Sequence, residues 1–89
     1  GPIEVGRVLG LSASRAAHVV VEIYGMPLGD LLRQRRIARA KRLLLSTDLP
    51  AGAIAAQCGF ASQHWFNRLF SRLVGEAPAR WRRAQRAGA

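Results

Sequence analysis

The sequence predicts an all-α fold in which two helix-turn-helix subdomains are joined by a long central helix. One observation is a repeated motif: a glycine, an apolar residue and a serine follow one another at residues 10–12 and again within residues 59–62. Another is the spacing of apolar residues at steps of three and four, as in an amphipathic helix. The predicted parts are a first helix-turn-helix over 1–27, a linker helix over 28–45, and a second helix-turn-helix with a C-terminal helix over 46–89.

The first subdomain is predicted to hold two helices. Residues 3–9 indicate a short helix, and Ser12 is a suitable N-cap for a helix over residues 13–24 that Gly25 ends. A run of three valines in that segment favours a strand by propensity. We prefer a helix because the run lacks alternation and apolar residues keep helical spacing, with Val21 then nearer to solvent. The residues with this spacing are Ala16, Val19, Val20 and Ile23.

The linker helix over 28–45 begins with Asp30 in its first turn, where an acid complements the helix dipole. Its apolar residues do not form one narrow stripe, so we expect its two ends to pack against different bodies. Arg36 falls within the wide apolar face, and we expect its side chain to be partly buried.

The second subdomain contains the stretch around which the chain is organised. An apolar helix ends at Gly59, because glycine accepts the left-handed backbone found just past a helix C-terminus. Phe60 is expected to fill the corner, and Ser62 to cap a helix over residues 62–74. The apolar stripe of that helix comprises Trp65 or Phe66, then Leu69, Phe70 and Leu73, and its opposite side carries Gln63, His64, Asn67, Arg68 and Arg72.

A final helix begins at Pro78, and Trp81 is expected to pack back on the core. Four arginines of this helix are expected to face water or phosphate. They are Arg80, Arg82, Arg83 and Arg86.

Charge indicates an anionic partner. The chain has 14 Lys and Arg against 5 Asp and Glu, a formal net charge of +9. Such an excess attracts the phosphates of nucleic acid, and it also suits an anionic membrane surface. The alternative function is therefore a basic interaction or membrane-surface module, in which the helix over 28–45 would lie on lipid.

Other functional classes find little support in the sequence. Cys58 is the single cysteine, and its alanine-rich surroundings favour a role in core packing. His18 and His64 lie far apart, so we predict no metal and no cofactor. No set of catalytic residues is readable, which predicts that the chain is not an enzyme. No membrane span or signal peptide is visible, so a cytoplasmic, nucleoid-associated location is expected. Gly1-Pro2 resembles a protease scar, which indicates a domain cut from a longer protein.

The polar face of residues 62–74 has side chains suited to reading bases, although an ordinary solvated face is the alternative. Gln63 and Asn67 offer the paired donor and acceptor that suit adenine, and Arg68 offers the fork that suits guanine O6 and N7. Basic residues expected to contact phosphate are Arg15, Arg35, Arg42, Arg72, Arg80 and Arg83. The capped helix N-termini at Ser12 and Ser62 could also receive phosphate.

The whole pattern resembles the DNA-binding domain of the AraC/XylS family of bacterial transcription regulators. The resemblance rests on LGLSASR at 9–15, the Gly25 turn, Arg36 to Ala40 with Leu43-Leu44, IAxxCGF at 54–60, Ser62, Phe66, Arg68 to Phe70, Gly75, and PxxWR at 78–82. It implies a homeodomain-like fold that reads two major-groove segments of double-stranded promoter or operator DNA with helices 13–24 and 62–74.

The same resemblance implies particular residues and partners. Base-reading positions fall on Gln63, His64, Asn67 and Arg68 in the second subdomain, and on Ser14, Ala17 and His18 in the first, with Arg15 near the backbone. Family members are usually activators, which implies RNA polymerase as a partner and an N-terminal effector or dimerisation domain outside this chain. The sequence departs from the family pattern in the small residues Ala16, Ala17 and Val20, and in lacking a helix before residue 3.

Overall fold

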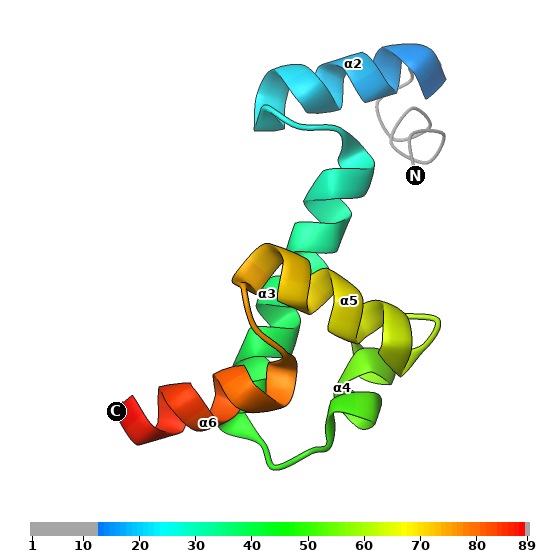
Figure 1. The fold of residues 1–89 in the computed structure, drawn as a ribbon. Coiled ribbons are helices and arrows are strands. Elements are labelled where there is room, and N and C mark those ends of the chain that lie inside the picture. The colour runs from blue at the N-terminus through cyan, green and yellow to red at the C-terminus, as the bar shows by residue number, and fades with distance from the viewer. Residues whose placement is uncertain (1–12, 89) are drawn as a thin grey trace. The chain divides into compact units, whose positions relative to one another are not determined.

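The computed structural model describes residues 13–88, and every element within that range is a helix or a connection between helices. The predicted all-α fold is therefore confirmed for the described residues. The helices are α2 (Ala13–Tyr24), α3 (Leu28–Ser46), α4 (Ala51–Gln57), α5 (Gln63–Val74) and α6 (Pro78–Gly88) (Figure 1). The predictions for residues 3–9, for the glycine at position 10 and for Ser12 as a cap lie outside this range.

The chain divides into two compact units within α3, one over 1–35 and one over 36–89. In the first unit, α2 is helical despite its valines, as predicted. Ala16 and Val20 are buried, and Val21 is 44% exposed, as its place on the outer side of the helix required. Gly25, with φ of 73°, ends α2 in the left-handed region that a side chain would disfavour.

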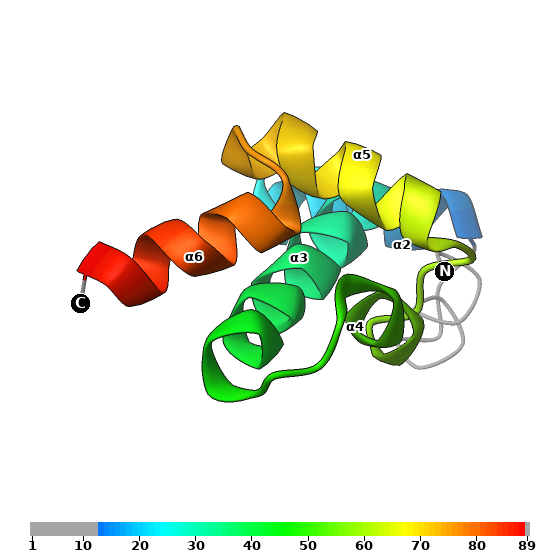
Figure 2. The same cartoon turned by 60° about the horizontal axis from the view of Figure 1, so that its bottom comes forward.

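The second unit has a continuous apolar core. In it α4, α5 and α6 pack around the C-terminal part of α3 (Figures 1 and 2). Its buried residues are Ile37, Ala40, Leu44, Ile54, Ala55, Cys58, Phe66, Phe70 and Trp81. The rings of Phe66, Phe70 and Trp81 meet edge to face in sequence, with centroids 5.7 Å apart at both contacts. The expected docking of Trp81 on the core is confirmed.

The structure decides one open prediction about side chains in the second unit and corrects two others. Phe66 is fully buried while Trp65 is 58% exposed, so Phe66 is the core residue of that pair. Leu73 was expected in the buried stripe, but it is 46% exposed, and the next residue, Val74, packs against the core instead. Arg36 was expected to be partly buried, but it is exposed, with its guanidinium beside Gly59 instead of within the core.

Candidate nucleic-acid interface

The corner between α4 and α5 fixes the direction in which α5 leaves the core. Gly59 has φ of 84°, and the amide of Phe60 donates to the carbonyl of Ala55 at 3.0 Å, which closes the end of α4. The ring of Phe60 then packs on Phe66, with centroids 5.1 Å apart. Ser62 caps α5 as predicted, since its hydroxyl accepts a hydrogen bond from the amide of Trp65 at 3.2 Å.

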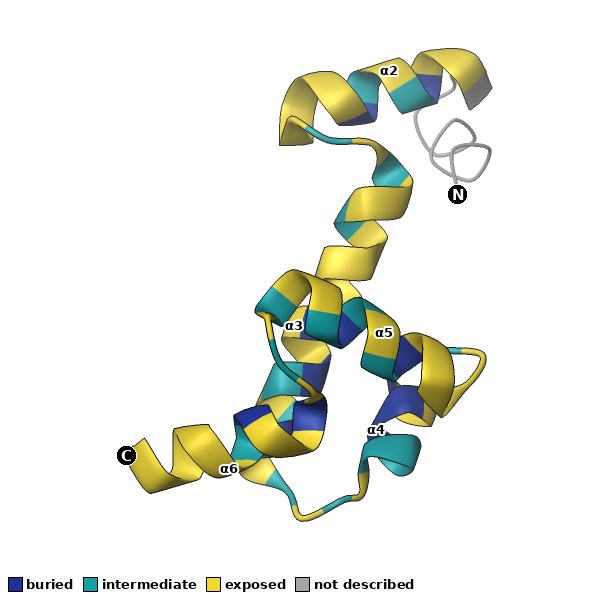
Figure 3. Ribbon diagram, viewed as in Figure 1, coloured by how far each residue is buried: buried dark blue, intermediate teal, exposed yellow. Residues whose placement is uncertain are grey.

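The outer side of α5 is polar and basic. Gln63, His64 and Arg68 are exposed, whereas Phe66 and Phe70 on the inner side are fully buried. Figure 3 shows this division along α5, with exposed positions in yellow and buried ones in dark blue. The core therefore holds α5 by one side and leaves the other accessible to a large partner.

Asn67 is less exposed than the other predicted base-reading residues of α5, which are Gln63, His64 and Arg68. Its side chain is half-buried, and its Oδ1 atom is shielded from solvent without a hydrogen-bond partner among the described residues. Pairing with adenine needs both ends of a carboxamide. Asn67 would therefore have to turn its carboxamide to read a base in that way.

Two contacts restrain the exposed polar side chains of α5. The guanidinium carbon of Arg68 lies 5.5 Å from the centroid of the Trp65 ring, within the range of a cation–π contact. The carboxamide of Gln63 approaches α4 so closely that a Cβ added to Gly52 would lie 2.9 Å from its Oε1. Neither contact was visible in the sequence pattern.

The predicted reading positions of the first unit lie along α2. Ser14 and His18 are exposed, Ala17 is half-buried, and Arg15 is exposed. The small side chain at Ala17 offers an apolar surface and no hydrogen-bonding group. This face is thus chemically sparser than the outer side of α5.

The arginines predicted to contact phosphate do not share one environment. Arg35, Arg42, Arg72 and Arg83 are exposed. Arg80 is also exposed, but its Nε lies 3.8 Å from Oε2 of Glu76, so a carboxylate already accompanies it. Ser12 lies outside the described residues, and the hydroxyl of Ser62 is occupied as a cap.

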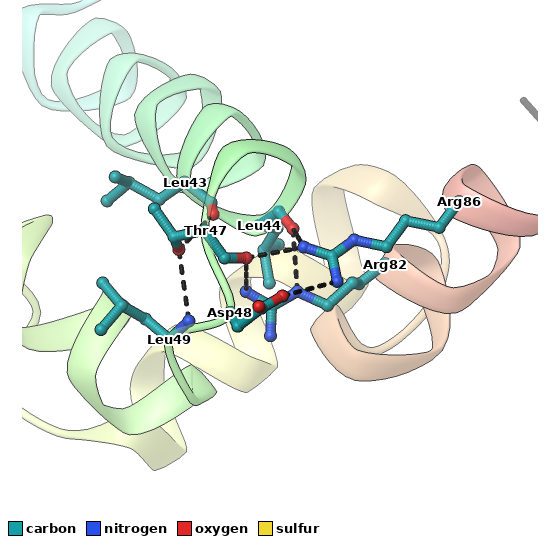
Figure 4. Close-up of polar contacts among 7 residues, drawn as sticks. All are labelled: Leu43, Leu44, Thr47, Asp48, Leu49, Arg82 and Arg86. Atoms are coloured by element: carbon teal, nitrogen blue, oxygen red, sulfur yellow. Dashed lines mark hydrogen bonds and ion pairs between the residues drawn. The ribbon is translucent and has the colours of Figure 1, made fainter.

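Arg82 and Arg86 were expected to face water or phosphate, but Arg82 is half-buried, and Arg86, although 42% exposed, also binds the protein. Both guanidinium groups bind the C-terminal end of α3 (Figure 4). Arg82 donates to the carbonyls of Leu44 at 2.8 Å and Thr47 at 3.1 Å. Arg86 donates to the same two carbonyls at 3.1 and 2.7 Å, and to Asp48 at 2.9 Å.

The last carbonyls of a helix have no partner within that helix, and the helix dipole is negative at that end. These carbonyls therefore attract cations such as the two guanidinium groups. One signal could have revealed this arrangement. Arg82 and Arg86 are four residues apart, hence on one face of α6, next to the buried Trp81. Both guanidinium groups are therefore engaged with polar groups of the domain itself.

Burial also shapes the chemistry of Cys58. Loss of solvation raises the pKa of this thiol above its usual value of 9.0, against the opposing charges of Arg39 and Arg42. A protonated thiol in an apolar site behaves as a small core residue, which agrees with the expected packing role.

Two further kinds of site are absent from the described range. No group of three or more His, Cys, Asp or Glu side chains in residues 13–88 could hold a metal ion. Among those residues, no helix is both long and apolar enough to cross a membrane.

Comparison with known proteins points to one family. The family described as "Helix-turn-helix domain" matches residues 5–84. Among curated relatives, the HTH-type transcriptional activator RhaR of Klebsiella pneumoniae is 45% identical over 65 residues, which cover 73% of this chain and 23% of that protein. The chain thus spans about a quarter of the length of the relatives it matches.

Solved structures give the same answer. The C-terminal domain of AraT, a response regulator from Geobacillus stearothermophilus, matches with a TM-score of 0.86 at 31% identity, covering 94% of this chain and 69% of that one. The DNA-binding domain of AdpA, a global transcriptional factor solved in complex with a target DNA, matches with a TM-score of 0.84 at 30% identity, covering 86% of this chain and 69% of that one.

Proposed function

Because this chain belongs to the AraC-type family of helix-turn-helix domains, we propose that it reads specific double-stranded DNA sequences with α2 and α5. DNA binding as part of a transcription regulator is supported by the family match, by relatives named as transcriptional activators, and by the neighbour solved on its target DNA. The family is one of binding domains, and we propose no catalytic activity and no cofactor for it.

The observation that carries the proposal is the outer side of α5. A helix that is anchored by Phe66 and Phe70, and that begins at a capped corner, presents polar and cationic side chains away from the core. A helix held in this way can enter a major groove without unfolding its own support. The backbone of the second unit would then meet DNA without rearrangement, and only side chains would move.

Four residues of α5 are proposed to read bases. Gln63 suits adenine, Arg68 suits the O6 and N7 atoms of guanine, and His64 lies between them on the exposed side. Asn67 is proposed to read adenine after its carboxamide turns outward. The first of these contacts to test is that of Arg68, because a guanine contact gives strong discrimination.

The first unit is proposed to read a second major-groove segment. Ser14, Ala17 and His18 would face bases there, with Arg15 near the backbone. Ala17 could contact a thymine methyl group, since it has no polar atom to offer. In this scheme residues 1–27 and 46–89 are the two reading parts, and 28–45 link them.

Phosphate contacts are assigned to exposed arginines and to helix N-termini. The proposed residues are Ser12, Arg15, Arg35, Arg42, Ser62, Arg72, Arg80 and Arg83. Arg80 would exchange its partner Glu76 for a phosphate, at a small cost because both groups are near the surface. At Ser62 the donors would be backbone amides at the start of α5.

The wider protein is proposed to be a bacterial activator. Its partners would then include RNA polymerase and an N-terminal effector or dimerisation domain, and it would act in the cytoplasm on nucleoid DNA. The membrane-surface alternative loses support because α3 gives Ile37, Ala40 and Leu44 to the core, so that these residues cannot enter lipid.

A selection experiment tests the proposal. The domain is bound to a random duplex library, and retained duplexes are sequenced and compared with scrambled ones over a range of salt. We expect enriched motifs about one helical turn apart and a log–log slope of about −0.9 per phosphate neutralised. Equal affinity for selected and scrambled duplexes would refute sequence-specific binding.

A further inference from the structure

We infer that Trp65 is a positioning residue, which holds Arg68 in the orientation that meets a base pair. The inference rests on the proposed DNA-reading function of α5. Trp65 belongs neither to the predicted reading face nor to the core. The sequence pattern had placed either Trp65 or Phe66 in the buried stripe.

Trp65 lies where a packing role does not explain it. Its side chain is 58% exposed, whereas the adjacent Phe66 is fully buried and supplies the core contact at that turn. Trp65 is not part of the apolar core of the second unit. A large aromatic surface in water is unfavourable unless it gains something in return. In the structure the ring contacts the guanidinium of Arg68, and it also meets the imidazole of His64 edge to face, with centroids 5.9 Å apart.

The geometry of that contact leaves Arg68 able to bind. Arg68 follows Trp65 by three residues, so the two side chains are neighbours on the surface of α5. The guanidinium carbon lies 5.5 Å from the ring centroid. A guanidinium that stacks on a ring uses its flat face, and its N–H donors then point outward in the plane of the group. Arg68 forms no ion pair among the described residues, so a carboxylate does not compete for those donors.

Holding the guanidinium in advance improves base discrimination. A free arginine loses much side-chain freedom when it forms a two-bond fork with guanine. A side chain that is already restrained loses less, which strengthens the correct contact without adding a new one. Through its contact with Arg68, Trp65 therefore acts on specificity at the base pair that Arg68 reads.

The test uses three single variants, one double variant and one matched control. Trp65→Leu removes the ring but keeps an apolar side chain, and Trp65→Phe keeps a smaller ring face. Both are compared with Arg68→Ala, alone and combined with Trp65→Leu. Leu73→Ala is the control, since Leu73 is another exposed apolar residue of α5, at 46%, and lies away from Arg68. Each variant is measured for its preference at every base pair of the selected site.

For Trp65→Leu we expect a loss of about two- to fivefold in discrimination, confined to the base pair that Arg68→Ala relaxes. Trp65→Phe should retain more of it, Leu73→Ala all of it, and thermal stability should not change. In the Arg68→Ala background, Trp65→Leu should have no further effect. Unchanged discrimination in Trp65→Leu, or an equal loss without Arg68, would overturn the inference.

A measurement without DNA separates this inference from the proposed function. In the free domain, the ring current of Trp65 should shift the side-chain proton resonances of Arg68 upfield in NMR spectra, and Trp65→Leu should remove the shift. A wild-type chain that selects no sequence would overturn the proposed function and this inference with it. Unshifted Arg68 resonances in a chain that does select a sequence would overturn this inference alone.

Discussion

A Cβ atom added to Gly52 of α4 would lie 2.9 Å from Oε1 of Gln63 on α5. The carboxamide of Gln63 thus occupies space that is open only because residue 52 has no side chain. The position of the Gln63 carboxamide, a proposed base-reading group, therefore depends on Gly52 in the preceding helix. In the structure the carboxamide of Gln63 therefore lies against α4.

Gly52→Ala should change specificity without weakening the fold. The clashing atom is the end of a flexible side chain, so Gln63 can move, while alanine favours helix over glycine by about 1 kcal/mol. We expect a thermal midpoint at or above wild type and an altered preference at one base pair in sequencing of selected duplexes. In a Gln63→Ala background the same substitution should leave the preference unchanged. An unaltered preference in the Gly52→Ala variant would show that Gln63 does not read a base while its carboxamide lies beside residue 52.

Arg68→Ala and Arg72→Ala should differ in kind, although both remove an exposed arginine from α5. Loss of a fork to guanine should cost roughly 1–3 kcal/mol at the preferred site and relax one base pair. Loss of a phosphate contact should weaken all duplexes alike and reduce the salt slope by about 0.9. Binding titrations on selected and scrambled duplexes over a salt series measure both effects. If the two variants have the same profile, their proposed roles are not distinct.

Arg82 should matter for stability more than for DNA. It donates from a half-buried position to the carbonyls of Leu44 and Thr47, and charged hydrogen bonds of this kind contribute about 1.5–3 kcal/mol. Arg82→Met should therefore lower the free energy of unfolding in urea by about that amount. The matched control is Arg83→Met, an exposed neighbour on α6, which should change stability by less than about 0.5 kcal/mol. Equal effects of the two would argue against the Arg82 contacts.

Arg86→Met should have a smaller effect than Arg82→Met. Arg86 contacts the same carbonyls, but its side chain is 42% exposed and its partner Asp48 is 94% exposed. An exposed ion pair contributes about 0.2–1 kcal/mol and is screened by salt. The stability lost in Arg86→Met should therefore shrink at high ionic strength more than that lost in Arg82→Met. Urea denaturation at two salt concentrations makes the comparison.

Local signals in the sequence predicted the helices well. The helix ends at Gly25, Gly59 and Gly75 can be predicted from one rule, that glycine favours the left-handed backbone just past a helix, and all three have positive φ. The cap at Ser62 likewise depends on residues that are adjacent along the chain. Such features follow from neighbouring residues, so one sequence is enough to find them.

The errors came from contacts between residues distant in sequence. Arg82 and Arg86 looked like surface charges because the carbonyls they bind lie more than 30 residues earlier. Leu73 has the helical spacing of a buried residue, but Val74 packs against the core in its place, which spacing on a helix does not reveal. Helical spacing predicted which residues share the candidate reading face. It did not predict the contacts of Gln63 with Gly52 and of Arg68 with Trp65, which only the structure shows.

Cys58 should make the stability of the domain depend on alkaline pH. Burial raises the pKa of its thiol above 9.0 in the folded chain, although the charges of Arg39 and Arg42 act in the opposite direction. The folded state then holds the proton more tightly than the unfolded state. This contribution to stability is complete below pH 9.0 and is lost as pH rises through the raised pKa.

The pH effect is measurable as the difference between two proteins. Thermal unfolding of wild type and Cys58→Ala is followed from neutral pH to well above 9.0, and the difference between the two proteins at each pH isolates the effect of the thiol. We expect wild type to lose stability more steeply with rising pH than Cys58→Ala does. The folded wild-type thiol should also react slowly with a maleimide and quickly after unfolding in urea, because the thiolate is the reactive form. Parallel pH curves together with fast labelling of the folded chain would mean that Cys58 is accessible and ionises normally.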